Sequence, residues 1–170
     1  RRDMLKVGAS ALALPALVPG HVWGQTPPSE TLRVGLIGCG GRARDVLGQS
    51  ADVKGFRIAA LCDCKIDRAR DFANLVPDGK TLGVYEDFRK MIEKEKLDAV
   101  MVETTTHARA WIVIHALQAG LDAYIEKPMC LTIAEGRAMV NAARKYNRIT
   151  QVGTQQRSIP INNWASDLIK

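Results

Sequence analysis

Short apolar segments alternate regularly with helical patterns along most of this chain, and that alternation constrains the fold more than any other feature. The predicted strands cover residues 32–37, 56–62, 98–102, 122–125 and 149–152, with a short extended segment at 82–85. The predicted helices cover residues 42–49, 65–75, 87–94, 107–119 and 132–147. Strands joined through helices run parallel, and a parallel sheet is covered by helices on both faces. The sequence therefore predicts an α/β fold with a doubly wound parallel sheet.

The size and composition of the chain fit this fold and exclude several others. Of the 170 residues, 46% are hydrophobic and 25% are charged, which suffices for a packed core without a metal or disulfide. The formal net charge is +6, but only three Phe, three Tyr and three Trp occur and no basic-aromatic pattern is present. We therefore expect no nucleic-acid partner. No apolar run reaches the roughly 20 residues that a membrane span needs.

The amino-terminal 25 residues differ in character from the rest. The pair Arg1-Arg2 precedes the small and apolar segment 7–18, and this pattern resembles a twin-arginine export signal. We expect export to a bacterial periplasm, with no stable membrane insertion after the signal at 1–25 is removed. The alternative is a short amphipathic helix, but residues 7–18 have no polar face and Pro15 would interrupt it. Residues 26–30 are predicted to be a Pro-rich linker.

The glycine-rich segment Gly38-Cys39-Gly40-Gly41-Arg42-Ala43 follows the first predicted strand and opens the first predicted helix. It fits the pattern Gly-x-Gly-x-x-Gly/Ala, in which each small residue has a steric reason. Gly38 makes the tight turn, Gly40 lets backbone approach a pyrophosphate, and Ala43 lets helix and strand pack closely. The free N–H groups at the start of the helix attract phosphate. This segment predicts a dinucleotide site.

Asp63 lies at the end of the second predicted strand, 20 residues after Ala43. A carboxylate there accepts hydrogen bonds from the ribose hydroxyls and repels a 2′-phosphate, so it favours NAD over NADP. Lys65 and Arg68 are close enough in the sequence to leave NADP as the less favoured cofactor. The alternative role for Asp63 is that of a helix N-cap.

The segment Tyr124-Ile125-Glu126-Lys127-Pro128 leaves the strand predicted at 122–125. Pro128 cannot continue the strand, so the chain turns and exposes Glu126 and Lys127 at the edge where such sheets bind ligands. Glu-Lys-Pro in this position resembles the signature of the Gfo/Idh/MocA family, which includes glucose–fructose oxidoreductase and inositol dehydrogenase. Further motifs that match this family are Tyr85-Glu86-Asp87-Phe88, Gln118-Ala119-Gly120 and Val152-Gly153-Thr154-Gln155-Gln156-Arg157-Ser158.

The resemblance covers residues 31–170 and implies a specific organisation. Residues 31–153 would form an NAD(P)-binding Rossmann domain, and residues 154–170 would begin a second α/β domain that is truncated in this chain. The whole protein would be a nicotinamide-dependent oxidoreductase of a sugar, polyol or sugar derivative, and a homo-oligomer. We expect this chain alone to be inactive, because hydride transfer needs both reactants held together and shielded from water.

The resemblance also implies roles for single residues. Lys127 would lie near the nicotinamide and the reacting hydroxyl of the substrate, where an ammonium group stabilises alkoxide charge or relays a proton. Glu126 would lie near the nicotinamide ribose, and Gln155 near the nicotinamide end. The predicted catalytic residue is Lys127, and the predicted cofactor-binding residues are Gly38, Gly40, Gly41, Arg42, Ala43, Asp63, Thr104, His107, Glu126, Lys127 and Gln155.

The loop at 103–109 matches a family stretch usually written Ala-Thr-Pro-x-x-x-His, with departures. Thr104 and His107 match positions near the cofactor, whereas Thr105 replaces the usual Pro and Arg109 stands where a His is common. These departures indicate an altered pocket. The alternative for His107 is a residue at the start of a helix that makes only local hydrogen bonds.

Other classes of site and function fit less well. The four cysteines do not have the spacing of a zinc or redox site, so no metal is predicted. An NAD-dependent glycosidase that acts by transient oxidation belongs to the same family, but such enzymes tend to replace the motif Lys, and Lys127 is present. A non-catalytic nucleotide-sensing module is a second alternative. A methyltransferase that uses S-adenosylmethionine is a third, since it also has a glycine turn and an acidic residue after its second strand.

Overall fold

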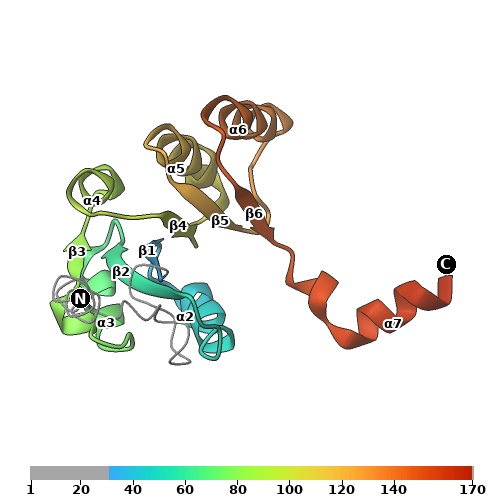
Figure 1. The fold of residues 1–170 in the computed structure, drawn as a ribbon, viewed down its shortest axis with the longest axis horizontal. Helices are drawn as coiled ribbons and strands as arrows, with labels where there is room; N and C mark the ends of the chain where they lie inside the picture. The colour runs from blue at the N-terminus through green and yellow to red at the C-terminus, as the bar shows by residue number, and fades with distance from the viewer. Residues whose placement is uncertain (1–30, 170) are drawn as a thin grey trace, which may run out of the picture. The chain divides into compact units, whose positions relative to one another are not determined.

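A computed structural model describes residues 31–169 (Figure 1), so the expected export signal at 1–25 and linker at 26–30 lie outside the described residues. Six parallel strands form one sheet in the order β3-β2-β1-β4-β5-β6. Their bounds are β1 Leu32–Ile37, β2 Phe56–Cys62, β3 Gly83–Tyr85, β4 Ala99–Val102, β5 Asp122–Glu126 and β6 Thr150–Gly153. The predicted doubly wound α/β fold is confirmed.

The helices cover the two faces of the sheet separately. On one face α2 (Gly41–Gln49) and α3 (Ile66–Ala73) pack against β1 and β2, with Phe72 and Leu36 fully buried between them. On the other face are α4 (Phe88–Lys94), α5 (Thr106–Gln118) and α6 (Ile133–Tyr146), around a core that includes Val113 and Ile125. Each face therefore has its own hydrophobic core (Figure 1).

Most elements differ from the predicted bounds by one residue, and contacts in the structure accompany two of the differences. Helix α3 ends at Ala73 and not at Leu75, and a 3-10 turn, η4 (Gly79–Thr81), follows it. Gly79 folds back so closely that a Cβ on it would lie 1.8 Å from the Ala73 carbonyl oxygen, which leaves no room for another turn of helix. Strand β6 begins one residue later than predicted, because the Ile149 N–H is bound by the Asp122 carboxylate before the ladder starts.

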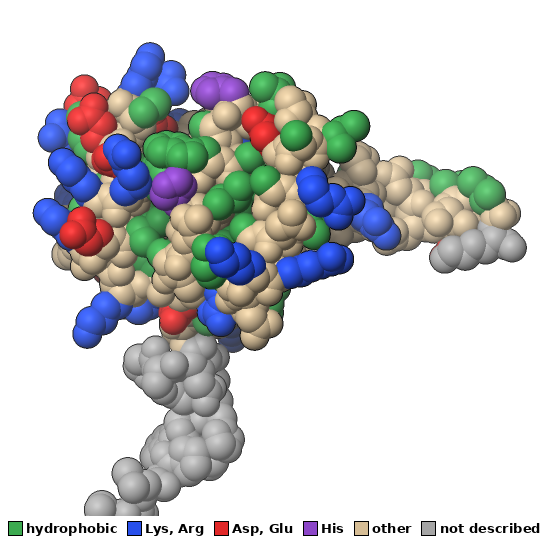
Figure 2. Space-filling model, turned by 90° about the horizontal axis from the view of Figure 1, so that it is seen from above, with side chains coloured by type: hydrophobic (Ala, Val, Ile, Leu, Met, Phe, Trp, Pro, Cys, Tyr) green, Lys and Arg blue, Asp and Glu red, His purple; other side chains and the backbone are tan. Residues whose placement is uncertain are grey.

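The chain beyond β6 forms a 3-10 turn, η5 (Gln155–Ser158), and helix α7 (Pro160–Ile169), neither of which has a buried residue. Figure 2 shows the side of α4, α5 and α6, where basic and acidic side chains are interspersed over much of the surface. Within residues 31–169 no helix has the length and hydropathy of a membrane span. The same residues contain no cluster of three or more His, Cys, Asp or Glu side chains placed to hold a metal ion.

The topology defines where a ligand can bind. The helix after β1 lies on one face of the sheet and the helix after β4 lies on the other, although β1 and β4 are neighbours. The chain therefore turns to opposite faces after these two strands, which is the arrangement at which parallel sheets bind ligands. The predicted cofactor-binding residues lie at the end of or after β1, β2, β4, β5 or β6 at this edge, whereas the family motif Gln118-Ala119-Gly120 precedes β5 at the opposite edge.

Candidate dinucleotide site

The glycine turn after β1 can accept no other residue at its first position. Gly38 has φ +96°, in the left-handed region, and a Cβ on it would lie 2.8 Å from the carbonyl carbon of Glu103. Its N–H donates to the Cys62 carbonyl at 2.8 Å. The turn is therefore pressed between the ends of β2 and β4, which brings the segments after these two strands next to it.

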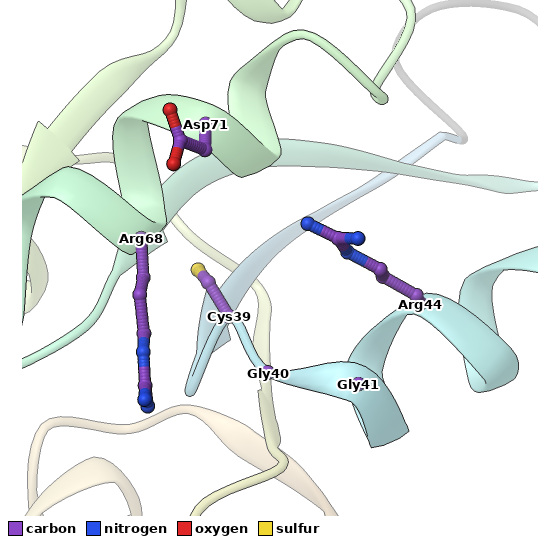
Figure 3. Close-up of a pocket in the computed structure, with 6 residues that line it drawn as sticks. All are labelled: Cys39, Gly40, Gly41, Arg44, Arg68 and Asp71. Atoms are coloured by element: carbon purple, nitrogen blue, oxygen red, sulfur yellow. The ribbon is translucent and has the colours of Figure 1, made fainter.

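The next two glycines leave open space above the backbone. A Cβ on Gly40 or Gly41 would meet no atom within 4 Å, and the start of α2 carries no side-chain cap. A cavity of about 310 Å³ lies over this turn. Its lining residues are Cys39, Gly40, Gly41, Arg44, Arg68 and Asp71, as Figure 3 shows. The open backbone, the free helix N–H groups and the two arginines together suit an anionic phosphate group.

Asp63 holds this turn from the neighbouring strand. It is only 8% exposed, and its carboxylate accepts hydrogen bonds from the backbone N–H of Cys39 at 2.9 Å and of Lys65 at 2.8 Å. The N-cap residue of α3 is Lys65, so Asp63 is not the helix cap that was the alternative. A carboxylate has room for further acceptor contacts, so a ribose hydroxyl can still approach it. Its predicted role toward the ribose stays a prediction.

Glu126 and Arg42 connect the glycine turn to the Glu-Lys-Pro segment. The prediction that the turn exposes Glu126 is wrong, because β5 continues through this residue and leaves it 2% exposed. Arg42, in the first turn of α2, donates through Nε to the Glu126 carboxylate. The other Glu126 oxygen accepts the N–H of Lys127. Lys127 itself is exposed and follows directly on this buried pair. The structure thus brings the predicted residues Gly38, Arg42, Asp63 and Glu126 together at one edge, with Lys127 next to them.

The loop after β4 contributes Thr104, His107 and Arg109 in different ways. The Thr104 hydroxyl oxygen is buried without a hydrogen-bond partner. His107 is exposed in the first turn of α5, and its Nδ1 lies 3.2 Å from the Thr105 hydroxyl, which is the local contact expected of a helix-start residue. The buried Arg109 guanidinium donates to the carbonyls of Thr104 and Pro128, so it ties this loop to the Glu-Lys-Pro turn.

Gln155 is the first residue of η5, two residues beyond the end of β6. Its amide oxygen is buried without a partner, as the Thr104 hydroxyl is. Buried polar atoms normally have a hydrogen-bond partner, so unpaired atoms at a ligand-binding edge fit a site completed by a bound molecule. Ala43 is fully buried in the core between α2 and the sheet, as its packing role predicts.

Sequence reasoning missed one buried charged residue at this edge. Glu103 is 7% exposed at the end of β4, and neither of its carboxylate oxygens has a partner. Burial and the nearby Glu126 charge raise the pKa of the Glu103 carboxyl to about 7, although Arg42 and Arg109 act in the opposite direction. The available signal was an acidic residue that directly follows an apolar strand.

The cysteines take no visible part in this chemistry. All four are free thiols in the structure, and burial raises the pKa of the Cys39 and Cys62 thiols to about 12. A thiol that stays protonated at neutral pH is a poor nucleophile. Cys39 therefore serves as a small buried residue within the turn.

Comparison with known proteins agrees with this geometry. Residues 32–154 match the family described as "Oxidoreductase family, NAD-binding Rossmann fold" (Gfo/Idh/MocA). The chain is 38% identical over 113 residues to D-apiose dehydrogenase of Paraburkholderia graminis, a match that covers 65% of the chain and 28% of the relative. It is 27% identical over 129 residues to a glycosyl hydrolase family 109 protein of Porphyromonas gingivalis, covering 72% of the chain and 28% of the relative.

A solved structure is similar over a comparable stretch. An oxidoreductase of Agrobacterium radiobacter in complex with NAD+, L-tartaric acid and magnesium has a TM-score of 0.67 and 27% identity, and the match covers 72% of this chain and 35% of that one. The chain thus spans less than a third of the two curated relatives and about a third of this structure. The resemblance inferred from the Glu-Lys-Pro segment is confirmed: the chain belongs to the Gfo/Idh/MocA oxidoreductase family and contains its NAD-binding Rossmann fold.

Proposed function

We propose that the whole protein oxidises a sugar, polyol or sugar derivative by hydride transfer to NAD, and that this chain holds the dinucleotide. The observation that carries the proposal is the open glycine turn at an uncapped helix start, beneath a cavity lined by two arginines. Membership of an NAD-binding oxidoreductase family and the similarity to an apiose dehydrogenase support the reaction and substrate class.

Each part of the site has its own proposed role. The backbone N–H groups at Gly40 and Gly41 would hold the pyrophosphate, and the Asp63 carboxylate would accept hydrogen bonds from the adenosine ribose. When bound, the nicotinamide supplies the hydride acceptor. Lys127 is the proposed catalytic residue, because its exposed ammonium group follows the buried Glu126 at the edge where the reacting hydroxyl would lie. There the ammonium form would stabilise alkoxide charge by donating a hydrogen bond, and only the neutral amine form would accept the hydroxyl proton.

NAD is the proposed cofactor in preference to NADP. The buried Asp63 carboxylate carries negative charge next to the turn, which opposes a 2′-phosphate. Arg44 and Arg68 line the cavity and offer some compensation, as Figure 3 shows, whereas Lys65 is not among its lining residues. We therefore expect NADP to bind more weakly than NAD but not to be rejected completely.

A pair of glycine variants tests the dinucleotide site. Gly40→Ala places a methyl group in open space, so the fold should persist while the pyrophosphate loses its close approach to backbone. NAD affinity of the whole protein, measured by calorimetry, should fall by roughly tenfold or more, equivalent to about 1.4 kcal/mol. Gly48→Ala, on the exposed side of the same helix, is the matched control and should leave affinity unchanged. Equal affinities in the two variants would remove the glycine turn from the proposed site.

A second candidate function is an NAD-dependent glycosidase, which the similarity to the glycosyl hydrolase family 109 protein favours. The two functions differ in products. A dehydrogenase accumulates NADH in proportion to oxidised sugar, whereas a glycosidase releases an aryl group from an aryl glycoside with no net NADH. Lys127 in the Glu-Lys-Pro segment supports the dehydrogenase. Dinucleotide binding with neither product would indicate a nucleotide-sensing module, and binding of S-adenosylmethionine alone would indicate a methyltransferase.

Export and assembly are also part of the proposal. Arg1-Arg2 and the apolar segment 7–18 support export to a bacterial periplasm by the twin-arginine route. Replacing both arginines by lysine in a reporter fusion should abolish export, whereas continued export would contradict this route. We further propose that the whole protein is a homo-oligomer, which light scattering of the purified protein tests directly.

A further inference from the structure

Glu103 is a buried carboxyl group that the proposed reaction does not use. It is 7% exposed, and both of its side-chain oxygens are enclosed without a hydrogen-bond partner. A buried carboxylate without hydrogen bonds is costly, whereas the neutral acid is much less so. The surroundings of Glu103 therefore favour the neutral carboxylic acid, so this group changes its protonation state near neutral pH.

The charged and titratable groups that act on Glu103 come from every element around it. Glu126 and Tyr124 belong to β5, Arg42 to α2 and Arg109 to α5. Arg42 is bound to Glu126, and two N–H groups of Arg109 donate to backbone carbonyls. The two arginines therefore attract Glu103 without a hydrogen bond to it, and Glu126 repels it. Burial together with these charges raises the pKa of the Glu103 carboxyl to about 7.

Glu103 also touches the proposed cofactor site through its backbone. Its carbonyl group packs against Gly38, and its N–H donates to Ile37 at 2.8 Å. The Glu103 carboxyl interacts electrostatically with Arg42, which lies in the first turn of α2 and is paired with the Glu126 carboxylate. Negative charge in this place disfavours an anionic ligand at the turn and competes with Glu126 for Arg42.

We propose that Glu103 is a positioning residue that sets the affinity for dinucleotide through its own protonation. Neutral Glu103 leaves Arg42 paired with Glu126 beside the turn, and ionised Glu103 withdraws that guanidinium and repels the pyrophosphate. Dinucleotide binding above neutral pH is then accompanied by uptake of a fraction of a proton by the Glu103 carboxylate, since the anionic ligand favours the neutral acid. The inference rests on the proposed function to the extent that NAD binds at the glycine turn.

The test is a titration of the whole protein with NAD at pH 6, 7 and 8, in the wild type, Glu103→Gln and Glu93→Gln. Glu93 lies exposed on α4, so its variant removes the same charge away from the site. The wild type and Glu93→Gln should lose roughly 5- to 10-fold in affinity from pH 6 to pH 8, a coupling of about 1 kcal/mol. Glu103→Gln should change less than about twofold and keep the affinity that the wild type has at pH 6. Calorimetry in buffers of different ionisation enthalpy should also show that proton uptake is absent from this variant.

Several outcomes would overturn the inference. A wild-type affinity that does not depend on pH, or a dependence that persists in Glu103→Gln, would mean that Glu103 does not control binding. If neither the wild type nor any variant binds dinucleotide at any pH, the proposed function fails. Carbon-13 NMR of the labelled Glu carboxyls then measures the protonation of Glu103 independently of binding. The signal that is missing from Glu103→Gln should titrate near pH 7, and titration of that signal below pH 5 would refute the inference.

Discussion

Asp63 and Glu103 lie at the ends of the two strands that flank β1, and they are buried to almost the same degree, at 8% and 7% exposed. Their surroundings are opposite. The Asp63 carboxylate accepts two backbone N–H groups, while neither Glu103 oxygen has a partner. The comparison shows that burial alone does not decide the free-energy cost of keeping a carboxylate ionised inside a fold. This cost also depends on how many N–H groups donate hydrogen bonds to the carboxylate.

The two regions meet at Gly38, where the largest effect is expected. Gly38→Ala forces a side chain into a backbone conformation with φ +96° and against the Glu103 carbonyl carbon at 2.8 Å. The free energy of unfolding should fall by about 4 kcal/mol, from backbone strain and overpacking combined. Denaturant unfolding measures this, with Gly48→Ala as the control in open space. A Gly38→Ala protein of unchanged stability would mean that the strands flanking β1 do not press on the turn.

The second-largest expected effect is a dependence of stability on pH that comes from the Glu103 carboxyl. The unfolded chain releases the Glu103 proton at the ordinary pKa of 4.5, but the folded protein keeps it up to about 7. Stability is therefore lost as pH rises between these values, and the loss is complete above pH 7. Glu103→Gln should be more stable than the wild type at pH 8 by on the order of 3 kcal/mol, and equally stable at pH 4. Thermal melts across pH 4–8 measure this, and a constant difference would contradict the unpaired carboxyl.

The third expected effect follows from removing the Asp63 carboxylate, which accepts two backbone N–H groups on the other side of β1. Asp63→Ala leaves the N–H groups of Cys39 and Lys65 without their acceptor, and the Cys39 N–H is buried. The free energy of unfolding should fall by about 2 kcal/mol. Asp63→Asn keeps one acceptor oxygen, so we expect about half that loss at pH 7. If the alanine and asparagine variants are equally stable, the two hydrogen bonds do not hold the turn.

The smallest structural effect belongs to Lys127, which is exposed and directly follows the buried Glu126. The side chain is exposed, so Lys127→Ala should change the free energy of unfolding by less than about 0.5 kcal/mol. In the whole protein, turnover of the proposed sugar or polyol substrate should nevertheless fall by roughly 100-fold or more, as for the loss of a general acid or base. A variant that is stable and fully active would show that Lys127 is a solvated surface charge.

Much of the fold was predictable because its signals are local. Each buried parallel strand is a short apolar run, and Gly or Pro punctuation marks where strands end. The bounds were less accurate where a distant contact intervened. Gly79 folding onto Ala73 shortens α3, and Asp122 binding the Ile149 N–H moves the start of β6. The contact between Asp122 and Ile149 spans 27 residues and cannot be recognised from a window of neighbouring residues.

The site was predictable in part for the same reason. The turn at Gly38 and the acidic residue Asp63 follow from steric and electrostatic requirements at fixed spacings. Glu103 escaped notice, because a single acidic residue after a strand carries no signal of how it is paired. Arg109 was seen only as a departure from the family pattern, whereas its guanidinium joins the loop after β4 to the turn at Pro128.

The amino-acid sequence by itself determined the parallel α/β architecture, the position of the glycine turn and the family to which the chain belongs. Only the tertiary structure decided which buried charges are satisfied. The Arg42–Glu126 pair joins residues 84 positions apart, and the unpaired state of Glu103 depends on three other elements. The physical reason is that chain geometry acts over a few residues, whereas Coulomb forces and desolvation depend on whatever the fold brings within several ångströms.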